Sequence, residues 1–173
     1  ALTKAGADVN VKNDYGSTVL MYAVRNNKNP EVIETLIKAN AGVTDELLAL
    51  AASYNENPEV IEALIKAGVD VNAKDESGNA ALMYAVRNNK NPEVIEALTK
   101  AGADVNAKDK YGNTALIDAV RNNKNPEVIE ALIKAGADVN VKDESGDTVL
   151  IDAVWNNENP EVIEALTKAG ADV

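Results

Sequence analysis

The sequence predicts an all-α solenoid of five stacked helix pairs, with finger loops that project from one edge. Two observations carry this prediction: a recurring six-residue motif, and apolar positions at helical spacing in every interval between its copies. The motif Asn-Pro-Glu-Val-Ile-Glu contains all five prolines of the chain and begins at Asn29, Asn57, Asn91, Asn125 and Asn159. The intervals are 28, 34, 34 and 34 residues. A fixed period of this size is typical of a repeat array.

Each copy of the motif predicts the start of a helix. Asparagine is a favourable N-cap because its side-chain oxygen accepts a backbone N–H of the first turn. Proline at the next position has no N–H to lose there, and its φ already suits a helix. Glutamates in the first turn favour the positive end of the helix dipole. We therefore expect a second helix of each unit to begin directly after each of these asparagines.

The unit that follows Gly112 shows the complete pattern. Thr114 can cap a first helix, and the polar run 122–125 is a turn. A second helix begins at Pro126 and ends at Gly136, which can supply a left-handed stop. The apolar stripe of this second helix is Val128, Ile129, Leu132 and Ile133. One unit cannot bury such a stripe alone, so stacked neighbours should form one continuous core.

We interpret residues 1–173 as a single repeat domain. A partial unit covers 1–13, and the full units are about 14–40, 41–74, 75–108, 109–142 and 143–173. The second unit lacks the six residues that correspond to 73–78. We therefore expect no finger between Val43 and Asp45, a groove that is open beside Tyr54, and an incoming helix capped by Thr44 or Asp45.

The first nine residues of the chain are identical to the last nine, 165–173. This overlap suggests a segment of a longer array or a built sequence. Both ends should then expose faces that are shaped to stack on another unit. Complementary faces on one molecule make head-to-tail contacts, so we expect weak self-association.

Composition argues against several functions. The formal net charge is −11, and there are only three arginines, so a nucleic-acid partner is not expected. The chain has no cysteine and no histidine, which removes thiolate chemistry and the commonest acid–base group. No apolar run approaches the length of a membrane span, so a membrane partner is not expected either. The sequence identifies no compartment.

The candidate chemical motifs also fail. Residues 104–109 open like a calcium loop, but Lys108 occupies a ligand position and no glycine follows it. The ten glycines are isolated, so no phosphate-binding loop is present. The carboxylates Glu31 and Glu34 recur in every unit, which indicates a solvated helix face rather than one catalytic site. We therefore predict no enzyme activity, no metal and no cofactor.

The repeated pattern resembles the ankyrin repeat family. The resemblance rests on Asp109-x-x-Gly112-x-Thr114-Ala115-Leu116 and on the run 131–140, and it covers the whole chain. The family's Thr-Pro-Leu-His motif is absent, and the units have 34 residues where the family has 33. The resemblance implies a protein-binding module that uses a concave groove and the finger tips, without enzyme activity.

Positions that differ between units are the candidates for binding. They lie at the loop tips and on the exposed side of the first helix, and all six aromatic residues of the chain lie among them or beside them. Tyrosine, tryptophan and arginine are enriched at binding hot spots. The candidate residues are Tyr15, Tyr22, Arg25, Tyr54, Tyr84, Arg87, Tyr111, Asp118, Arg121, Asp152 and Trp155.

Within this set we expect two areas of opposite charge. Neighbouring first helices stand side by side in such a stack, so Tyr84, Arg87, Tyr111 and Arg121 should form one continuous patch. The aspartates at 118 and 152 should form an acidic area that ends at 155. A groove of this kind would suit a partner of mixed charge.

Two functions remain. The first is a non-enzymatic module that binds a protein through the concave groove and finger tips. The alternative is a structural spacer or an engineered repeat scaffold without a dedicated partner. The near-identity of the units and the missing start methionine favour the alternative, in which the variable positions reflect neutral change on a solvated surface.

Overall fold

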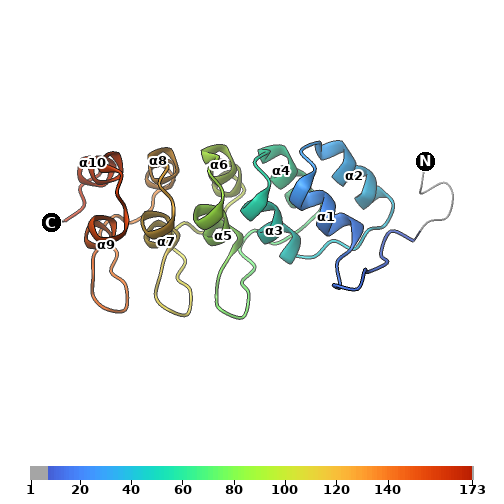
Figure 1. Cartoon of the computed structure of the whole chain (residues 1–173), viewed down its shortest axis with the longest axis horizontal. Coiled ribbons are helices and arrows are strands. Elements are labelled where there is room, and N and C mark those ends of the chain that lie inside the picture. Colours follow the sequence, from blue (N-terminus) through green and yellow to red (C-terminus); the bar gives the residue numbers. More distant parts are fainter. Residues whose placement is uncertain (1–7, 173) are drawn as a thin grey trace.

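The computed structural model describes residues 8–172, and within them the chain forms ten helices in five antiparallel pairs. The odd-numbered helices form one row and the even-numbered helices a second row above it (Figure 1). This arrangement confirms the predicted all-α solenoid. The helices are α1 (Val19–Asn26), α2 (Pro30–Lys38), α3 (Glu46–Tyr54), α4 (Pro58–Lys66), α5 (Ala81–Asn88), α6 (Pro92–Lys100), α7 (Ala115–Asn122), α8 (Pro126–Lys134), α9 (Val149–Asn156) and α10 (Pro160–Lys168).

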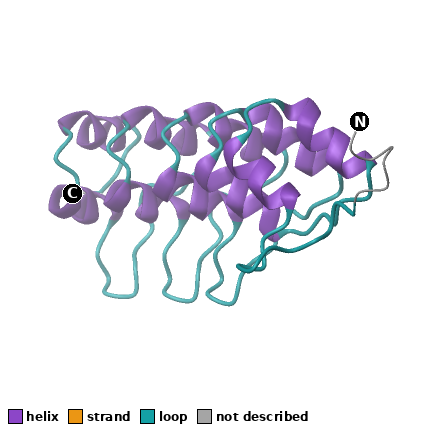
Figure 2. Cartoon of the chain, turned by 45° about the vertical axis from the view of Figure 1, so that its right-hand side comes forward, coloured by secondary structure: helices purple, strands orange, loops and turns teal. Residues whose placement is uncertain are grey.

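Each pair falls inside one of the predicted units, whose boundaries remain a prediction. Loops project beyond the row of odd-numbered helices (Figure 2), and we name each finger by the helix that it precedes. The α1 finger is 8–18, the α5 finger is 67–80, the α7 finger is 101–114 and the α9 finger is 135–148. The figure shows these fingers as loops, without strands.

The predicted caps of the even-numbered helices are present. In each motif the asparagine side chain accepts the backbone N–H of the glutamate two residues later, and proline occupies the first helical position. Three odd-numbered helices are capped by threonine, as predicted for Thr114. The exception among the fingered units is α5, because Ala80 occupies the cap position and has no side-chain acceptor.

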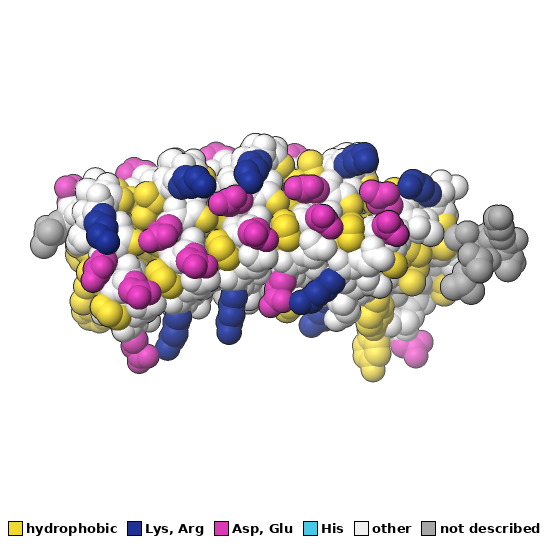
Figure 3. All heavy atoms as spheres, turned by 90° about the horizontal axis from the view of Figure 1, so that it is seen from above, with side chains coloured by type: hydrophobic (Ala, Val, Ile, Leu, Met, Phe, Trp, Pro, Cys, Tyr) yellow, Lys and Arg dark blue, Asp and Glu magenta, His cyan; other side chains and the backbone are white. Residues whose placement is uncertain are grey.

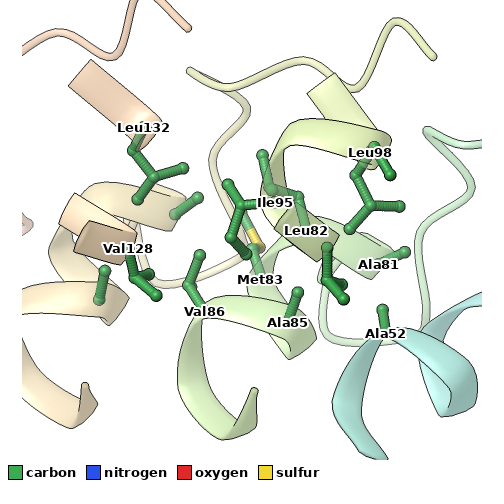
Figure 4. Close-up of a cluster of buried hydrophobic side chains, with 14 of the residues drawn as sticks. Ala52, Ala81, Leu82, Met83, Ala85, Val86, Ile95, Leu98, Val128 and Leu132 are labelled. Atoms are coloured by element: carbon green, nitrogen blue, oxygen red, sulfur yellow. The ribbon is translucent and has the colours of Figure 1, made fainter. Parts of the chain in front are cut away.

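The core lies between the two rows of helices (Figure 4). Leu82 and Met83 of α5 pack with Ile95 and Leu98 of α6, and the next pair contributes Leu132. Leu98 is fully buried, like Leu132 at the same position of the predicted stripe one unit later. The same stripes recur in each pair, so the core runs through the whole stack instead of closing within a unit.

Buried asparagines at the inter-helix turns join each unit to the one before it. Asn89 donates its Nδ2 to the carbonyls of Ala52 and Asn55 at 3.0 and 2.9 Å. Its Oδ1 accepts the backbone N–H of Asn91. The same pair of donations recurs from Asn55, Asn123 and Asn157. The result is a ladder of hydrogen bonds through the array, inside the core where an unpaired carbonyl is costly.

The shortened unit behaves as expected in one respect and not in another. No finger and no strand form between residues 40 and 46, which confirms the predicted gap. Asp45 occupies the N-cap position of the incoming helix, as predicted, but its side chain makes no cap hydrogen bond. Its Oδ1 accepts the backbone N–H of Asp70 at 2.8 Å. At the other fingers the corresponding acceptor is an asparagine, as where Oδ1 of Asn72 accepts the backbone N–H of Asp104.

Candidate partner-binding surface

The candidate residues lie on the odd-numbered helices and on the fingers. The opposite face, made by the even-numbered helices, carries acidic and basic side chains in alternating rows (Figure 3). All six aromatic residues of the sequence lie outside the even-numbered helices. Tyr15 is 88 % exposed on the α1 finger and Trp155 is 85 % exposed on α9, while Tyr111 is exposed on the α7 finger. The two faces therefore differ sharply in aromatic content.

Three of the candidates form one cluster at α1 and α3. The guanidinium of Arg25 lies over the ring of Tyr54, 4.4 Å from its centroid. On the same helix as Arg25, Tyr22 accepts a hydrogen bond at its hydroxyl from Asn13 of the α1 finger. A shallow hollow of about 250 Å³ opens here, lined by Ser17, Met21, Tyr22, Arg25 and Leu50. All three clustered side chains are exposed, so the cluster is available to a partner.

Tyr84 differs from the exposed tyrosines because it is held by its own finger. It is half-buried, and its hydroxyl donates to the carboxylate of Asp75. This hydrogen bond, together with burial, raises the pKa of Tyr84. Burial alone would raise the pKa of Asp75, but the hydrogen bonds from Tyr84, Asn79 and Ser77 outweigh it and lower that pKa to about 2. The side chain of Tyr84 is therefore held in a fixed position on this surface.

The two central arginines are bound to the next unit. Arg121 of α7 places Nε 2.7 Å from Oδ1 of Asp152 on α9, and its Nη2 is 2.7 Å from Oδ2 of Asp143 on the α9 finger. One unit earlier, Nη2 of Arg87 lies 2.6 Å from Oδ2 of Asp118. Both arginine side chains are about three-quarters buried. They tie neighbouring odd-numbered helices together.

The expected acidic area at Asp118 and Asp152 is therefore wrong. The two residues are only 5 % and 6 % exposed, and each carboxylate faces an arginine of the preceding unit. Burial raises the pKa of Asp118, with Arg87 opposing that shift. Because Asp118 and Asp152 are paired with arginines inside the stack, they do not form an exposed acidic area.

Sequence reasoning missed this pairing, although a signal was present. An arginine on one first helix is followed by an aspartate 31 residues later, at 87 and 118 and again at 121 and 152. The pattern is interrupted twice. The short unit follows Arg25, and Trp155 occupies the position where the next arginine would stand. Residues that repeat in this manner between units are candidates for pairing with each other.

A second feature that sequence reasoning missed is a cavity beside the gap in the finger row. Its volume is about 420 Å³, and it lies between the start of α3 and the α5 finger. The lining residues are Asp45, Glu46, Ala49, Ala73, Lys74, Asp75, Glu76, Asn79 and Tyr84. The sequence predicted an open edge at the short unit but placed it beside Tyr54, which does not line this cavity.

Within residues 8–172, every helix is too short or too polar to span a membrane. In the same part of the chain, no group of three or more histidine, cysteine, aspartate or glutamate side chains is placed to hold a metal ion.

The sequence matches two family models of the same kind. A model described as ankyrin repeats (3 copies) matches residues 48–143 and 82–173. A model described as ankyrin repeats (many copies) matches residues 1–37. The residues outside both matches are 38–47, which contain the junction without a finger. The search of curated proteins gave no match.

Proposed function

Since the chain belongs to the ankyrin repeat family, we propose that it binds a protein partner through the side formed by the odd-numbered helices and the finger tips. Ankyrin repeats are in general protein–protein interaction modules, and proteins of this family are typically non-enzymatic. The observation that carries the choice of side is the distribution of exposed aromatic residues. They are absent from the sequence of the even-numbered helices.

The candidate residues take different roles in this proposal. The cluster of Tyr22, Arg25 and Tyr54 provides the anchor, because tyrosine and arginine are enriched among the residues that contribute most to binding. Tyr15 and Tyr111 extend the contact from two finger tips, and Trp155 extends it at the far end. Tyr84, Arg87, Asp118, Arg121 and Asp152 hold the surface in shape. A preformed surface loses little conformational entropy when a partner docks.

The test compares variants on the two sides of the array. The chain is immobilised, a partner is captured from an extract of the source cells, and calorimetry measures its affinity for each variant. Tyr54→Ala or Trp155→Ala should each weaken binding by more than about 1–2 kcal/mol if the residue is an anchor. The controls Glu34→Ala and Glu130→Ala, on even-numbered helices, should change the affinity little. Equal losses on both sides would favour the spacer or scaffold alternative.

A second copy of the chain is another partner that a specific observation favours. Val154 of α9 is 64 % exposed, whereas Val86 and Val120 at the same position of α5 and α7 are fully buried under the next unit. We propose that this face of α9 stacks weakly on the α1–α2 face of another copy. Sedimentation velocity should show mass rising with concentration, and Val154→Glu should abolish the rise. A concentration-independent monomer would refute the stacking.

A further inference from the structure

The fingers that precede α5, α7 and α9 are held to one another. Lys110 of the α7 finger donates its backbone N–H to the carbonyl of Ser77 in the α5 finger at 3.0 Å. The ammonium of Lys74 donates to the carbonyl of Lys108, 3.1 Å away, and Lys108 donates to Lys142 in the same manner. A Cβ added to Gly78 would lie 3.1 Å from the backbone nitrogen of Lys110, so the contact is close. Each finger thus has one flank that receives its neighbour.

Among residues 8–172, no finger lies on the other flank of the α5 finger. The six residues that would form a finger before α3 are absent from the sequence, and the row of fingers has a gap there (Figure 1). The cavity of about 420 Å³ lies on this flank, between α3 and the finger. Its size falls in the range of about 300–1,000 Å³ that is usual for binding sites. The cavity is the place that a finger of the second unit would otherwise occupy.

The open flank of the α5 finger presents two backbone groups whose counterparts in the α7 finger are paired with the α5 finger. By the 34-residue repeat, Glu76 corresponds to Lys110 and Lys74 corresponds to Lys108. Within residues 8–172, the N–H of Glu76 and the carbonyl of Lys74 have no hydrogen-bond partner. An extended chain in the cavity could accept from the first and donate a lysine ammonium to the second, as neighbouring fingers do. Adding a strand-like segment to a free backbone edge is a recurrent mode of peptide recognition.

The charges of the cavity select the side chains of that segment. Four carboxylates line it, and the single lysine among the lining residues directs its ammonium to the next finger. Ala49, Ala73 and the ring of Tyr84 supply apolar surface between the charges. We infer that the open flank of the α5 finger docks an extended, lysine-rich segment of the protein partner, which replaces the absent finger. This inference rests on the proposed protein-binding function.

The test uses the full chain and a short, end-capped peptide of alternating lysine and threonine, labelled with fluorescein. Threonine favours the extended conformation that the site requires. The variant Glu46→Gln/Glu76→Gln removes two exposed carboxylates of the cavity whose side chains have no hydrogen bond among the described residues. Two exposed charge pairs at about 0.2–1 kcal/mol each correspond to a loss of affinity of roughly two- to thirtyfold. Fluorescence anisotropy measures the loss.

The matched control is Glu127→Gln/Glu130→Gln on α8, which changes the net charge by the same amount on the opposite face. It should bind the peptide as tightly as the parent chain, apart from a small general charge effect. Inserting Ala-Lys-Asp-Glu-Ser-Gly, the sequence of residues 73–78, between Thr44 and Asp45 should fill the cavity and abolish binding in a folded protein. In NMR spectra, the backbone amide signal of Glu76 should shift most when the peptide binds. Lys110 is the comparison, because its N–H is already paired with the neighbouring finger.

Several results would overturn the inference. They are equal losses in the two double variants, equal binding of a peptide with glutamate in place of lysine, and no binding of the lysine peptide. The proposed function has a separate readout, because Tyr54 and Trp155 lie outside the cavity. Partner binding that depends on Tyr54 and Trp155 but is unaffected by Glu46→Gln/Glu76→Gln would preserve the proposed function and remove this site.

Discussion

Arg121 of α7 holds both carboxylate oxygens of Asp152 on α9, with Nε 2.7 Å from Oδ1 and Nη2 2.9 Å from Oδ2. Arginine suits this task because its planar guanidinium matches a carboxylate with two parallel hydrogen bonds. The aspartate is buried and the arginine is only partly exposed. The pair therefore belongs to the stacking interface, although both positions vary between units and would otherwise suggest a binding surface.

Arg121→Ala should destabilise the protein by about 3 kcal/mol, because it leaves the buried carboxylate of Asp152 without its counter-ion. The free energy of unfolding from urea titration measures the loss. The double variant Arg121→Met/Asp152→Leu should recover part of it, because the buried charge of Asp152 is removed together with its partner, although Asp143 still loses its bond to Arg121.

Arg25→Ala is the matched control for that prediction. Arg25 occupies the same position of its helix, but it stacks on Tyr54 and has no carboxylate partner among residues 8–172. An exposed cation–π contact contributes about 0.5–1 kcal/mol. If Arg25→Ala and Arg121→Ala cost the same, the inter-unit ion pair does not contribute as we argue.

Asn89→Ala should lower the free energy of unfolding by about 2–4 kcal/mol. Its side chain serves two carbonyls of the preceding unit and one N–H of its own turn, and all three groups lose their partner in a buried site. Asn27→Ala is the control, because within the described residues Asn27 makes only the local bond to the N–H of Asn29. It should cost about 1 kcal/mol. A larger loss for Asn27→Ala in chemical denaturation would contradict the ladder.

Ala80→Thr should stabilise the protein by about 1 kcal/mol by supplying the missing cap of α5. Ala80 has φ −93° and ψ 168°, nearly the same as Thr114 with φ −96° and ψ 169°, so threonine fits the backbone there. The reverse change, Thr114→Ala, should destabilise α7 by a similar amount. Thermal unfolding of both variants checks the pair, and stabilisation by neither residue at these positions would refute the cap argument.

The helices and their caps could be predicted from the sequence because their causes are local. Asn91 begins a helix through its own side chain and the proline that follows, and the spacing of Leu98 from the stripe residues places it in the core. The repeat period then supplies the stacking, since every unit has the same unsatisfied stripe. The gap before α3 follows directly from six missing residues.

The contacts between units could not be predicted in the same way. Asp45 is a good N-cap by residue type, but its Oδ1 accepts the N–H of Asp70 in the α5 finger instead. Asp118 varies between units, which suggested an exposed residue, but it pairs with Arg87 on the neighbouring helix. Both errors have one cause: a repeat position contacts neighbouring helices and fingers, and residue type alone does not show which residue it contacts.

The hydrogen bonds that Asp75 accepts within the α5 finger and from Tyr84 should make the free energy of unfolding depend on pH. The folded-state pKa of Asp75 is about 2, below its ordinary value of 3.8, because hydrogen bonds from Tyr84, Asn79 and Ser77 outweigh burial. Above pH 3.8 both the folded and the unfolded chain carry this charge, so the contribution to stability is complete and constant. Between pH 3.8 and about 2 the unfolded chain takes up the proton first, so the contribution is lost as the pH falls.

Asp75→Asn should therefore be less stable than the parent at neutral pH, and the difference should shrink as the pH falls from about 4 to about 2. Urea titrations across this range measure it. Tyr84→Phe removes the strongest of the hydrogen bonds that lower the pKa of Asp75, so it should reduce the acid-induced loss by part of the same amount.

Asp118 opposes this trend, because its pKa is raised by burial and its protonation relieves a cost in the folded state. That contribution is common to the parent and both variants, so it cancels in the comparison. If the difference in the free energy of unfolding between the parent and Asp75→Asn stays constant down to about pH 2, these hydrogen bonds do not stabilise the ionised carboxylate of Asp75.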